Sequence, residues 1–207
     1  VEGIRRDGNR FEVATPKGRI SAGDVVVATN GYTDGGLPWL RRRVVPVISE
    51  MIATAPLSPN LMRVLMPKGR MCGESRHIGH YYRPSPDGTR ILLGGRRYAD
   101  DKSQAIARLK RGLVEIFPDL TDVALDHHWF GFVAFPMDEL PKLAMHDGVH
   151  YAAGFCGSGV VWARWMGQKA ALRILGDDAG KSAFSERPFR AIPFFNGNPW
   201  FLPAMMA

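Results

Sequence analysis

The stretch that most constrains the fold of this chain lies at residues 151–176, where the sequence predicts a strand, a glycine-rich turn and a helix in succession. Residues 149–153 are mostly apolar, and Gly154, Gly157 and Gly159 then interrupt the regular backbone before a helical pattern begins. Glycines at such a turn let a ligand approach the main chain closely. The stretch therefore predicts either a tight structural turn or a ligand-binding one.

The predicted helix begins at Gly159 and ends at Gly176. Helical spacing places four residues on one face, namely Ala163, Gly167, Ala170 and Ile174. The first N–H groups of a helix have no intrahelical acceptor, and together with the helix dipole they favour a negative charge or a polar acceptor. A nucleotide or flavin is the natural candidate for such a ligand.

Two interpretations of this turn stay open. It binds a nucleotide or flavin, or its glycines only allow the tight strand-to-helix turn that many α/β proteins need. The pattern differs from a dinucleotide fingerprint, because position 162 is Trp162 instead of a third glycine, and no strand ending in an acidic residue follows. A cofactor turn at this place would therefore be a second one.

Composition places the chain in the globular class. Its 207 residues are 45% apolar and 10% aromatic, enough to fill the core of one domain or of parts of two. The net charge of +7 permits an acidic partner, but the longest basic run is only Arg41 to Arg43. No basic helix face, stacking aromatics or zinc spacing accompanies it, so nucleic-acid binding is not predicted. The run is expected to be a solvated loop or a surface that contacts a partner.

Cys72 and Cys156 lie far apart and give no disulfide framework, which favours a reducing compartment. Cys156 precedes a helix start but has no nearby base, so it is expected to be a small packed residue and not a nucleophile. None of the six histidines has partners at metal-ligand spacing, so no metal site is predicted. With no signal peptide and no apolar stretch of membrane length, we expect a cytoplasmic protein without a membrane partner.

The first 28 residues predict a small β-meander with turns at residues 7–9 and 16–18. Residues 24–31 then form an apolar run that ends in small residues, as expected of a parallel strand buried on both faces. Ligands meet open α/β sheets at the ends of such strands. Because the chain begins within its first predicted strand, without an initiator Met, we expect it to be a fragment.

The meander followed by VVVATNGYT resembles flavoprotein oxidoreductases of the D-amino-acid-oxidase-like superfamily, which includes glycine oxidase and sarcosine oxidase. Residues 150–161 resemble the second flavin motif of that family, Gly-x-x-Gly-x-Gly before a long C-terminal helix. The resemblance implies these cofactor-binding residues: Ala28, Thr29, Asn30, Gly31, Gly154, Gly157, Ser158, Gly159 and Val160. It also implies that main-chain donors at residues 157–160 stabilise charge on the flavin as it is reduced.

The middle of the chain resembles the substrate domain of the family, a mostly antiparallel sheet above the flavin. Residues 43–54 predict a long strand, residues 80–84 and 90–95 predict a hairpin, and residues 103–117 predict a helix capped by Ser103. Because that sheet covers the flavin in relatives, the candidate substrate residues are Tyr81, Tyr82, Arg96 and Trp129. Aromatic residues on strands also fill cores, and no residue is assigned as a catalytic base.

Residues 125–141 resemble the Trp-x-Gly segment of the family. Amino-acid oxidases of this group commonly place an arginine two residues after that glycine, where it clamps the substrate carboxylate. Here that position is Val133. The resemblance implies oxidation of a C–N bond of an amine or amino acid by hydride transfer to FAD. Val133 favours an amine without a carboxylate at the reacting carbon, as in the γ-glutamylputrescine-oxidase-like branch.

The predicted fold class is α/β (α+β), with a partial FAD-binding Rossmann-like domain and a mostly antiparallel substrate sheet. The resemblance places residues 1–45 and 136–180 in the FAD-binding domain, residues 46–135 in the substrate domain and residues 181–207 in a C-terminal tail. The sequence contains no Gly-x-Gly-x-x-Gly turn for the FAD pyrophosphate. The chain alone is therefore expected to bind FAD weakly or not at all, and to need an N-terminal half as its partner. Two alternatives stay open, a noncatalytic fragment or subunit that needs such a partner and a standalone α/β module that binds an anion or nucleotide.

Overall fold

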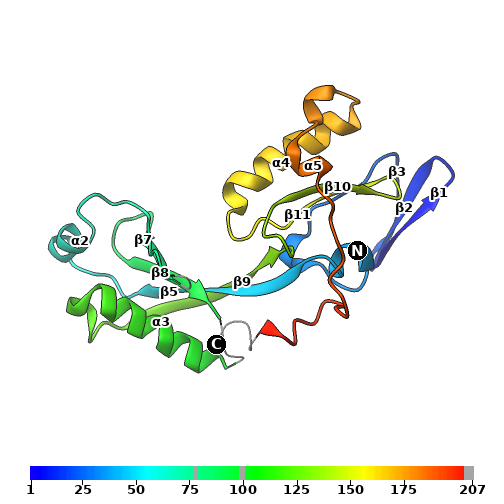
Figure 1. The fold of residues 1–207 in the computed structure, drawn as a ribbon. Helices are drawn as coiled ribbons and strands as arrows, with labels where there is room; N and C mark the ends of the chain where they lie inside the picture. Colours follow the sequence, from blue (N-terminus) through cyan, green and yellow to red (C-terminus); the bar gives the residue numbers. More distant parts are fainter. Residues whose placement is uncertain (77–78, 98–100, 203–207) are drawn as a thin grey trace. The chain divides into compact units, whose positions relative to one another are not determined.

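The chain divides into two compact units, shown in the computed structural model of Figure 1, which describes residues 1–76, 79–97 and 101–202. Of the described residues, the first unit contains 1–47 and 132–200, and the second contains 48–76, 79–97, 101–131 and 201–202. Each unit has apolar clusters of its own.

The first unit contains two three-stranded sheets. One is the predicted antiparallel meander of β1 (Gly3–Asp7), β2 (Arg10–Thr15) and β3 (Gly18–Ala22). The other joins β10 (Lys142–His146), β11 (Val149–Ala153) and β4 (Val26–Val27) in the order β10-β11-β4. In this second sheet β10 and β11 are antiparallel, whereas β4 runs parallel to β11, with Val27 opposite Tyr151.

The strand predicted at residues 24–31 is parallel, as expected, but much shorter, since only β4 pairs with a neighbour. Val27 is buried, whereas Val26 is 44% exposed. Among the described residues β4 is the edge strand of its sheet and has a neighbour on one side only. The expected burial on both faces is therefore wrong for Val26.

The helix α4 (Gly159–Ile174) follows β11, which confirms the predicted strand, turn and helix (Figure 1). It packs on the sheet through Met166 and Ala170, with Trp162 and Trp165 beside them. Of the residues on the predicted face, Ala170 is buried but Ala163 and Gly167 are exposed, because the helix meets the sheet mainly through larger side chains. The predicted stop at Gly176 is confirmed, since this residue has a φ of 72°.

The opposite face of β11 packs on the second apolar cluster of the first unit, which includes Leu40 of the short helix α1 (Pro38–Arg41). Arg43 follows that helix, and its guanidinium lies 4.0 Å from the ring centroid of Trp39. It also donates to the carbonyls of Trp39 at 2.7 Å and of Phe189 at 2.8 Å. The expectation that the basic run is a solvated loop or a partner surface is therefore wrong for Arg43, which fixes the C-terminal tail to this cluster.

The remaining short elements of the first unit are η1 (Asn30–Tyr32), η3 (Asp178–Gly180) and α5 (Ala183–Glu186).

The second unit is built on a five-stranded sheet of order β6-β7-β8-β5-β9. Its strands are β5 (Val45–Thr54), β6 (Cys72–Gly73), β7 (Tyr81–Pro84), β8 (Ile91–Arg96) and β9 (Leu125–Phe135). The pairs β6–β7, β7–β8 and β8–β5 are antiparallel, which confirms the predicted hairpin and the antiparallel character of this sheet. One face packs on α2 (Pro59–Leu65) and α3 (Lys102–Ile116), and η2 (Pro118–Leu120) follows α3.

The predicted helix at residues 103–117 corresponds to α3, but its N-cap is Asp101 and not Ser103. The Asp101 carboxylate accepts hydrogen bonds from the backbone N–H of Ser103 at 2.8 Å and from its hydroxyl at 2.9 Å. A carboxylate at this position also interacts favourably with the helix dipole. Leu109 and Leu113 are buried on the side of α3 that packs on the sheet.

Candidate functional site

The two segments predicted to border a cofactor meet at one edge of the β10-β11-β4 sheet. Because β4 and β11 are parallel neighbours, the turns that follow them leave the sheet at the same end. The side-chain oxygen Oδ1 of Asn30 accepts a hydrogen bond from the backbone N–H of Gly154 at 2.9 Å. This contact joins positions 124 residues apart, and it makes one corner of the two turns. We call residues 28–31 and 154–160 the corner.

The first side of the corner is a short helical turn, η1. Its backbone closes with a hydrogen bond from the N–H of Tyr32 to the carbonyl of Thr29 at 2.9 Å. The Thr29 hydroxyl lies 2.8 Å from the Thr33 hydroxyl, which donates to the Asn30 carbonyl at 2.7 Å. Asn30 has a φ of 47°, in the left-handed region that Asn tolerates better than most residues. The turn thus holds the Asn30 side chain toward Gly154, while Ala28 stays exposed.

Two of the corner glycines are explained by packing inside the chain. A Cβ at Gly31 would lie 2.7 Å from the backbone carbonyl carbon of Phe132, so glycine is needed for this close approach. Gly154 has a φ of 77°, and an added Cβ would overlap the ring of Pro136. These two glycines therefore have a structural reason that requires no ligand.

The glycines closer to α4 differ from these. Gly157 has a φ of 89°, but a Cβ there would meet nothing within 4 Å. At Gly159 the nearest atom to an added Cβ is Cδ2 of Phe155 at 3.6 Å, an ordinary van der Waals distance. The described chain therefore leaves open space beside Gly157 and room for a Cβ at Gly159.

The start of α4 adjoins this turn and has backbone N–H groups without an acceptor inside the helix. Ser158 makes no side-chain cap, and the N–H of Val161 is already bonded to the Ser158 carbonyl at 3.2 Å. By their position the N–H groups of Gly159 and Val160 have no intrahelical acceptor. Val160 is 95% exposed, so the described residues leave its side chain uncovered.

Cys156 lies within this turn with a φ of 52°. Its Sγ donates to the Gly154 carbonyl at 3.3 Å, so the thiol takes part in the local geometry of the turn. Cys72 is also a free thiol.

The four candidate substrate residues lie in the second unit, and strand alternation separates them. Tyr82 points toward α3, and its ring meets Phe117 edge to face at 5.3 Å. Tyr81 lies on the opposite face, where its hydroxyl is 2.5 Å from that of Ser49. Arg96 is opposite Ser49 on the neighbouring strand and so shares this face with Tyr81.

Trp129 lies between His128 and Phe130 in β9. Those two neighbours face Glu50 and Arg97, on the α3 side of the sheet, so Trp129 points to the other side. Tyr81, Arg96 and Trp129 therefore share one face, and Tyr82 belongs to the core on the other.

Sequence reasoning missed a charged cluster under α3. Glu50 is 1% exposed, and Nε of Arg97 donates to its Oε1 at 2.6 Å. Nε2 of His128 lies 3.4 Å from the same oxygen, and the Arg97 guanidinium lies 5.2 Å from the Phe130 ring centroid. The signal was an acid within an otherwise apolar strand, since a buried carboxylate needs a cation. The sequence does not show which arginine supplies it.

No group of three metal-ligating side chains is found within residues 1–76, 79–97 and 101–202. In the same residues no helix combines the length and the apolar character needed to cross a bilayer.

Comparisons with known proteins agree on one family. Residues 1–173 match the family model described as DAO, FAD dependent oxidoreductase. The chain is 32% identical over 206 residues to a probable oxidoreductase OrdL of Rhizobium meliloti, covering 98% of this chain and 47% of that protein. It is 30% identical over 184 residues to a γ-glutamylputrescine oxidoreductase of Escherichia coli, covering 87% of this chain and 43% of that protein.

The fold is similar to that of a glycine oxidase from Geobacillus kaustophilus, with a TM-score of 0.71 at 21% identity over 93% of this chain and 51% of that one. The chain therefore spans about half the length of the curated relatives that it matches.

Proposed function

This chain belongs to the DAO family of FAD-dependent oxidoreductases, and on that premise we propose that it forms the C-terminal part of an enzyme that oxidises a C–N bond of an amine or amino acid. When bound, FAD supplies the hydride acceptor for such a reaction. The observation that carries the proposal is the corner, where two turns predicted to border the cofactor are joined by the bond between Asn30 and Gly154.

In this proposal the chain contributes main-chain donors and shape. The N–H groups of Gly159 and Val160 at the start of α4 have no intrahelical acceptor by their position, and in this proposal they favour a polar acceptor that gains negative charge. A Cβ at Gly157 would meet nothing within 4 Å, and Ser158 makes no side-chain cap, so its hydroxyl does not occupy these donors. Asn30 fixes the distance between the two turns. The residues present thus fit the electron-rich edge of a flavin ring.

We propose an amine without a carboxylate at the reacting carbon as the substrate. Position 133 in β9 is valine. The family resemblance implies that amino-acid oxidases commonly have an arginine at this position, which binds the carboxylate of the substrate. The 30% sequence identity to a γ-glutamylputrescine oxidoreductase also supports an amine as the substrate. The face that carries Tyr81, Arg96 and Trp129 is the proposed substrate face, and Tyr82 is left out because it packs in the core.

Substrate choice is tested by assaying the purified whole enzyme with D-alanine, glycine and a series of simple amines, including γ-glutamylated diamines. We expect kcat/KM to be at least tenfold higher for the best amine than for either amino acid. A clear preference for D-alanine or glycine would remove the amine proposal and leave the flavin proposal standing.

A second polypeptide segment is proposed to hold the FAD phosphates. No Gly-x-Gly-x-x-Gly turn is present in the 207 residues. The exposed edge of β4 and the exposed side of α4 with Ala163 and Gly167 are the surfaces that such a segment would cover. Co-expression with an N-terminal half taken from a close relative is expected to give a yellow protein with flavin absorbance near 450 nm, in the usual range for flavoproteins.

This mixing experiment also separates the alternatives. A colourless complex that assembles but holds no flavin would favour a noncatalytic subunit. Tight binding of a nucleotide by this chain alone would favour a standalone anion-binding module.

A further inference from the structure

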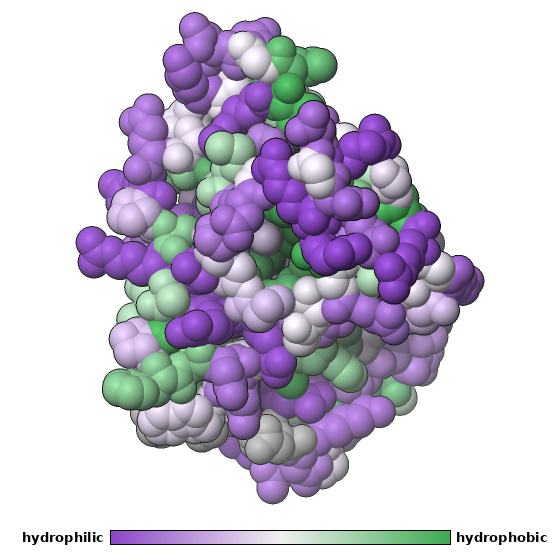
Figure 2. Space-filling view, turned by 90° about the vertical axis from the view of Figure 1, so that its right-hand side faces the viewer, coloured by the Kyte–Doolittle hydropathy of each residue, from purple (hydrophilic) through white to green (hydrophobic). Residues whose placement is uncertain are grey.

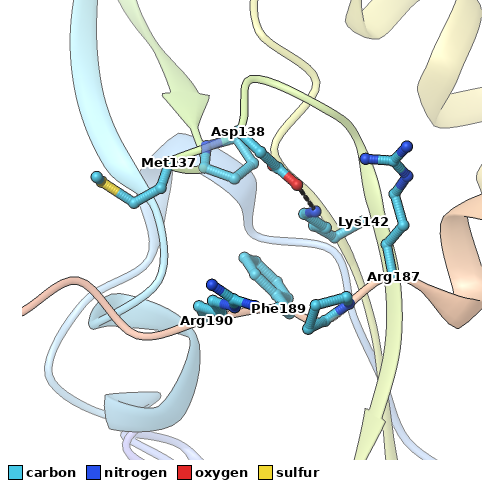
Figure 3. Close-up of a pocket in the computed structure, with 8 residues that line it drawn as sticks. Met137, Asp138, Lys142, Arg187, Phe189 and Arg190 are labelled. Carbon is cyan, nitrogen blue, oxygen red and sulfur yellow. Dashed lines mark hydrogen bonds and ion pairs between the residues drawn. The ribbon is translucent and has the colours of Figure 1, made fainter.

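A cavity of about 310 Å³ lies within the first unit, between the turn that joins β9 to β10 and the C-terminal tail (Figure 3). Three cationic side chains line it, Lys142, Arg187 and Arg190, together with one acid, Asp138. Pro136 and Phe189 are among its apolar walls. The side chains that line it therefore carry a net charge of about +2 at neutral pH.

Lys142 is unusual, because it is only 2% exposed although it lies in a strand of the sheet. Its ammonium group is paired with the Asp138 carboxylate, and Figure 3 shows the two groups in direct contact, joined by a dashed line. Burial raises the pKa of Asp138, but the hydrogen bonds from Lys142 and from the Leu140 N–H outweigh it and keep the pKa below its usual value. The Asp138 carboxylate therefore keeps its negative charge at neutral pH.

An ammonium group has three N–H donors, and the bond to Asp138 uses one of them. Within the described residues no other acceptor for Lys142 Nζ is found. Buried donors without acceptors are unfavourable, so a ligand atom that accepts from Nζ would be stabilised here.

The two arginines are held beside this group by an anchored segment of the tail. Phe189, which lies between them, accepts a hydrogen bond from Arg43 at 2.8 Å through its carbonyl and packs on Trp39 edge to face at 5.6 Å. The N–H of Ile192 donates to the Arg42 carbonyl at 2.8 Å. Arg187 and Arg190 therefore start from a fixed backbone, which lowers the entropy that binding costs.

We propose that this cavity binds the carboxylate group of a small organic monoanion, at a site that adjoins the corner through Pro136 but is lined by other residues. Guanidinium and ammonium groups are the usual partners of a carboxylate, and the apolar walls accept a short hydrocarbon chain. The volume is at the lower end of the range for small-molecule sites. The apolar walls favour an anion with a short hydrocarbon chain over inorganic phosphate, which has none.

The test uses butyrate as the probe, with the purified full-length protein in its flavin-loaded form. Titration calorimetry is expected to show saturable binding of butyrate with one site per chain. Arg187→Gln and Arg190→Gln should each weaken binding by about tenfold, the effect of losing one charge-assisted hydrogen bond. Arg164→Gln, an exposed arginine of α4, is the matched control and should leave binding unchanged. Both cavity arginines are exposed, so the variants should keep the melting temperature of the parent.

Four results would overturn the proposal. The first is that butyrate shows no saturable binding, and the second is that a double variant without both arginines binds butyrate as tightly as the parent. The third is that inorganic phosphate binds as tightly as butyrate, and the fourth is that butyrate binds only to the flavin-free protein. The last result would assign the cavity to the cofactor site instead of a separate one.

Discussion

Exchanging Gly154 or Gly159 of the corner for alanine is expected to change the stability of the protein very differently, although the two positions are only five residues apart. Gly154→Ala introduces a Cβ at a φ of 77°, which costs about 1–2 kcal/mol for a residue other than glycine. The same Cβ overlaps the Pro136 ring, and such overpacking costs about 1–3 kcal/mol. Together the two effects predict a loss of roughly 2–5 kcal/mol in the free energy of unfolding.

Gly159→Ala is the matched control. Its Cβ fits 3.6 Å from Phe155, and alanine is a better helix former than glycine. The free energy of unfolding should therefore stay within about 0.5 kcal/mol of the parent value or rise slightly, since the position is at the helix start.

Urea denaturation followed by circular dichroism measures both variants. With a slope of about 2 kcal/mol per molar urea, Gly154→Ala should lower the midpoint by roughly 1–2.5 M, and Gly159→Ala should hardly move it. A Gly154→Ala protein as stable as the parent would refute the packing argument for this turn. In the flavin-loaded protein, Gly159→Val should lower flavin occupancy or redox potential while leaving the apoprotein stable. Unchanged occupancy and potential would remove the helix start from the cofactor site.

Three further predictions address other contacts. Asn30→Ala should lose about 1–2 kcal/mol of stability in urea, because it removes the hydrogen bond to the Gly154 N–H and puts alanine at a φ of 47°. Asn30→Gly removes the same bond without the backbone strain and should lose less. Equal losses in the two variants would mean that the backbone angle is unimportant. Glu50→Ala should destabilise the protein by about 3–5 kcal/mol, since it leaves Arg97 buried without its carboxylate, and a melting temperature close to that of the parent would contradict this. Burial raises the pKa of Glu74, but hydrogen bonds from Arg76 and from the backbone and ring of His80 outweigh it and lower the pKa to about 2. Because its pKa in the folded state lies below the usual 4.5, Glu74 stabilises the fold above about pH 4.5 and loses that effect as the pH falls toward 2. Glu74→Gln should therefore flatten this part of the profile of unfolding free energy against pH, measured by urea titration.

Local patterns in the sequence predicted the elements that depend on neighbouring residues. The hairpin of β7 and β8 follows from alternation around a turn, and α4 follows from the glycines that begin and end it. The N-cap of α3 was misplaced by two residues, because Asp101 and Ser103 are both good caps and only the geometry chooses between them.

Interactions between distant residues were harder to predict. The packed side of α4 depends on how Trp162 and Trp165 meet the sheet, and the sequence does not contain that distance information. The stacking of Arg43 on Trp39 and the pairing of Glu50 with Arg97 also depend on the fold, so the sequence alone could not predict which residue each charged side chain contacts. The bond between Asn30 and Gly154 could be expected only as a proximity of two turns, through the resemblance.

The glycines of the corner show how the structure sharpens a sequence motif. All four glycines fit the same family pattern, yet Gly31 and Gly154 are required by Phe132 and Pro136, and Gly157 is favoured by its backbone angle. Gly159 alone among these four has neither a crowded neighbour nor a positive φ, and glycine costs a helix up to about 1 kcal/mol relative to alanine. Nothing in the described chain compensates for that cost. We propose that a ligand close to the main chain at the start of α4 does, which makes Gly159 the position where the motif points most directly to a bound group.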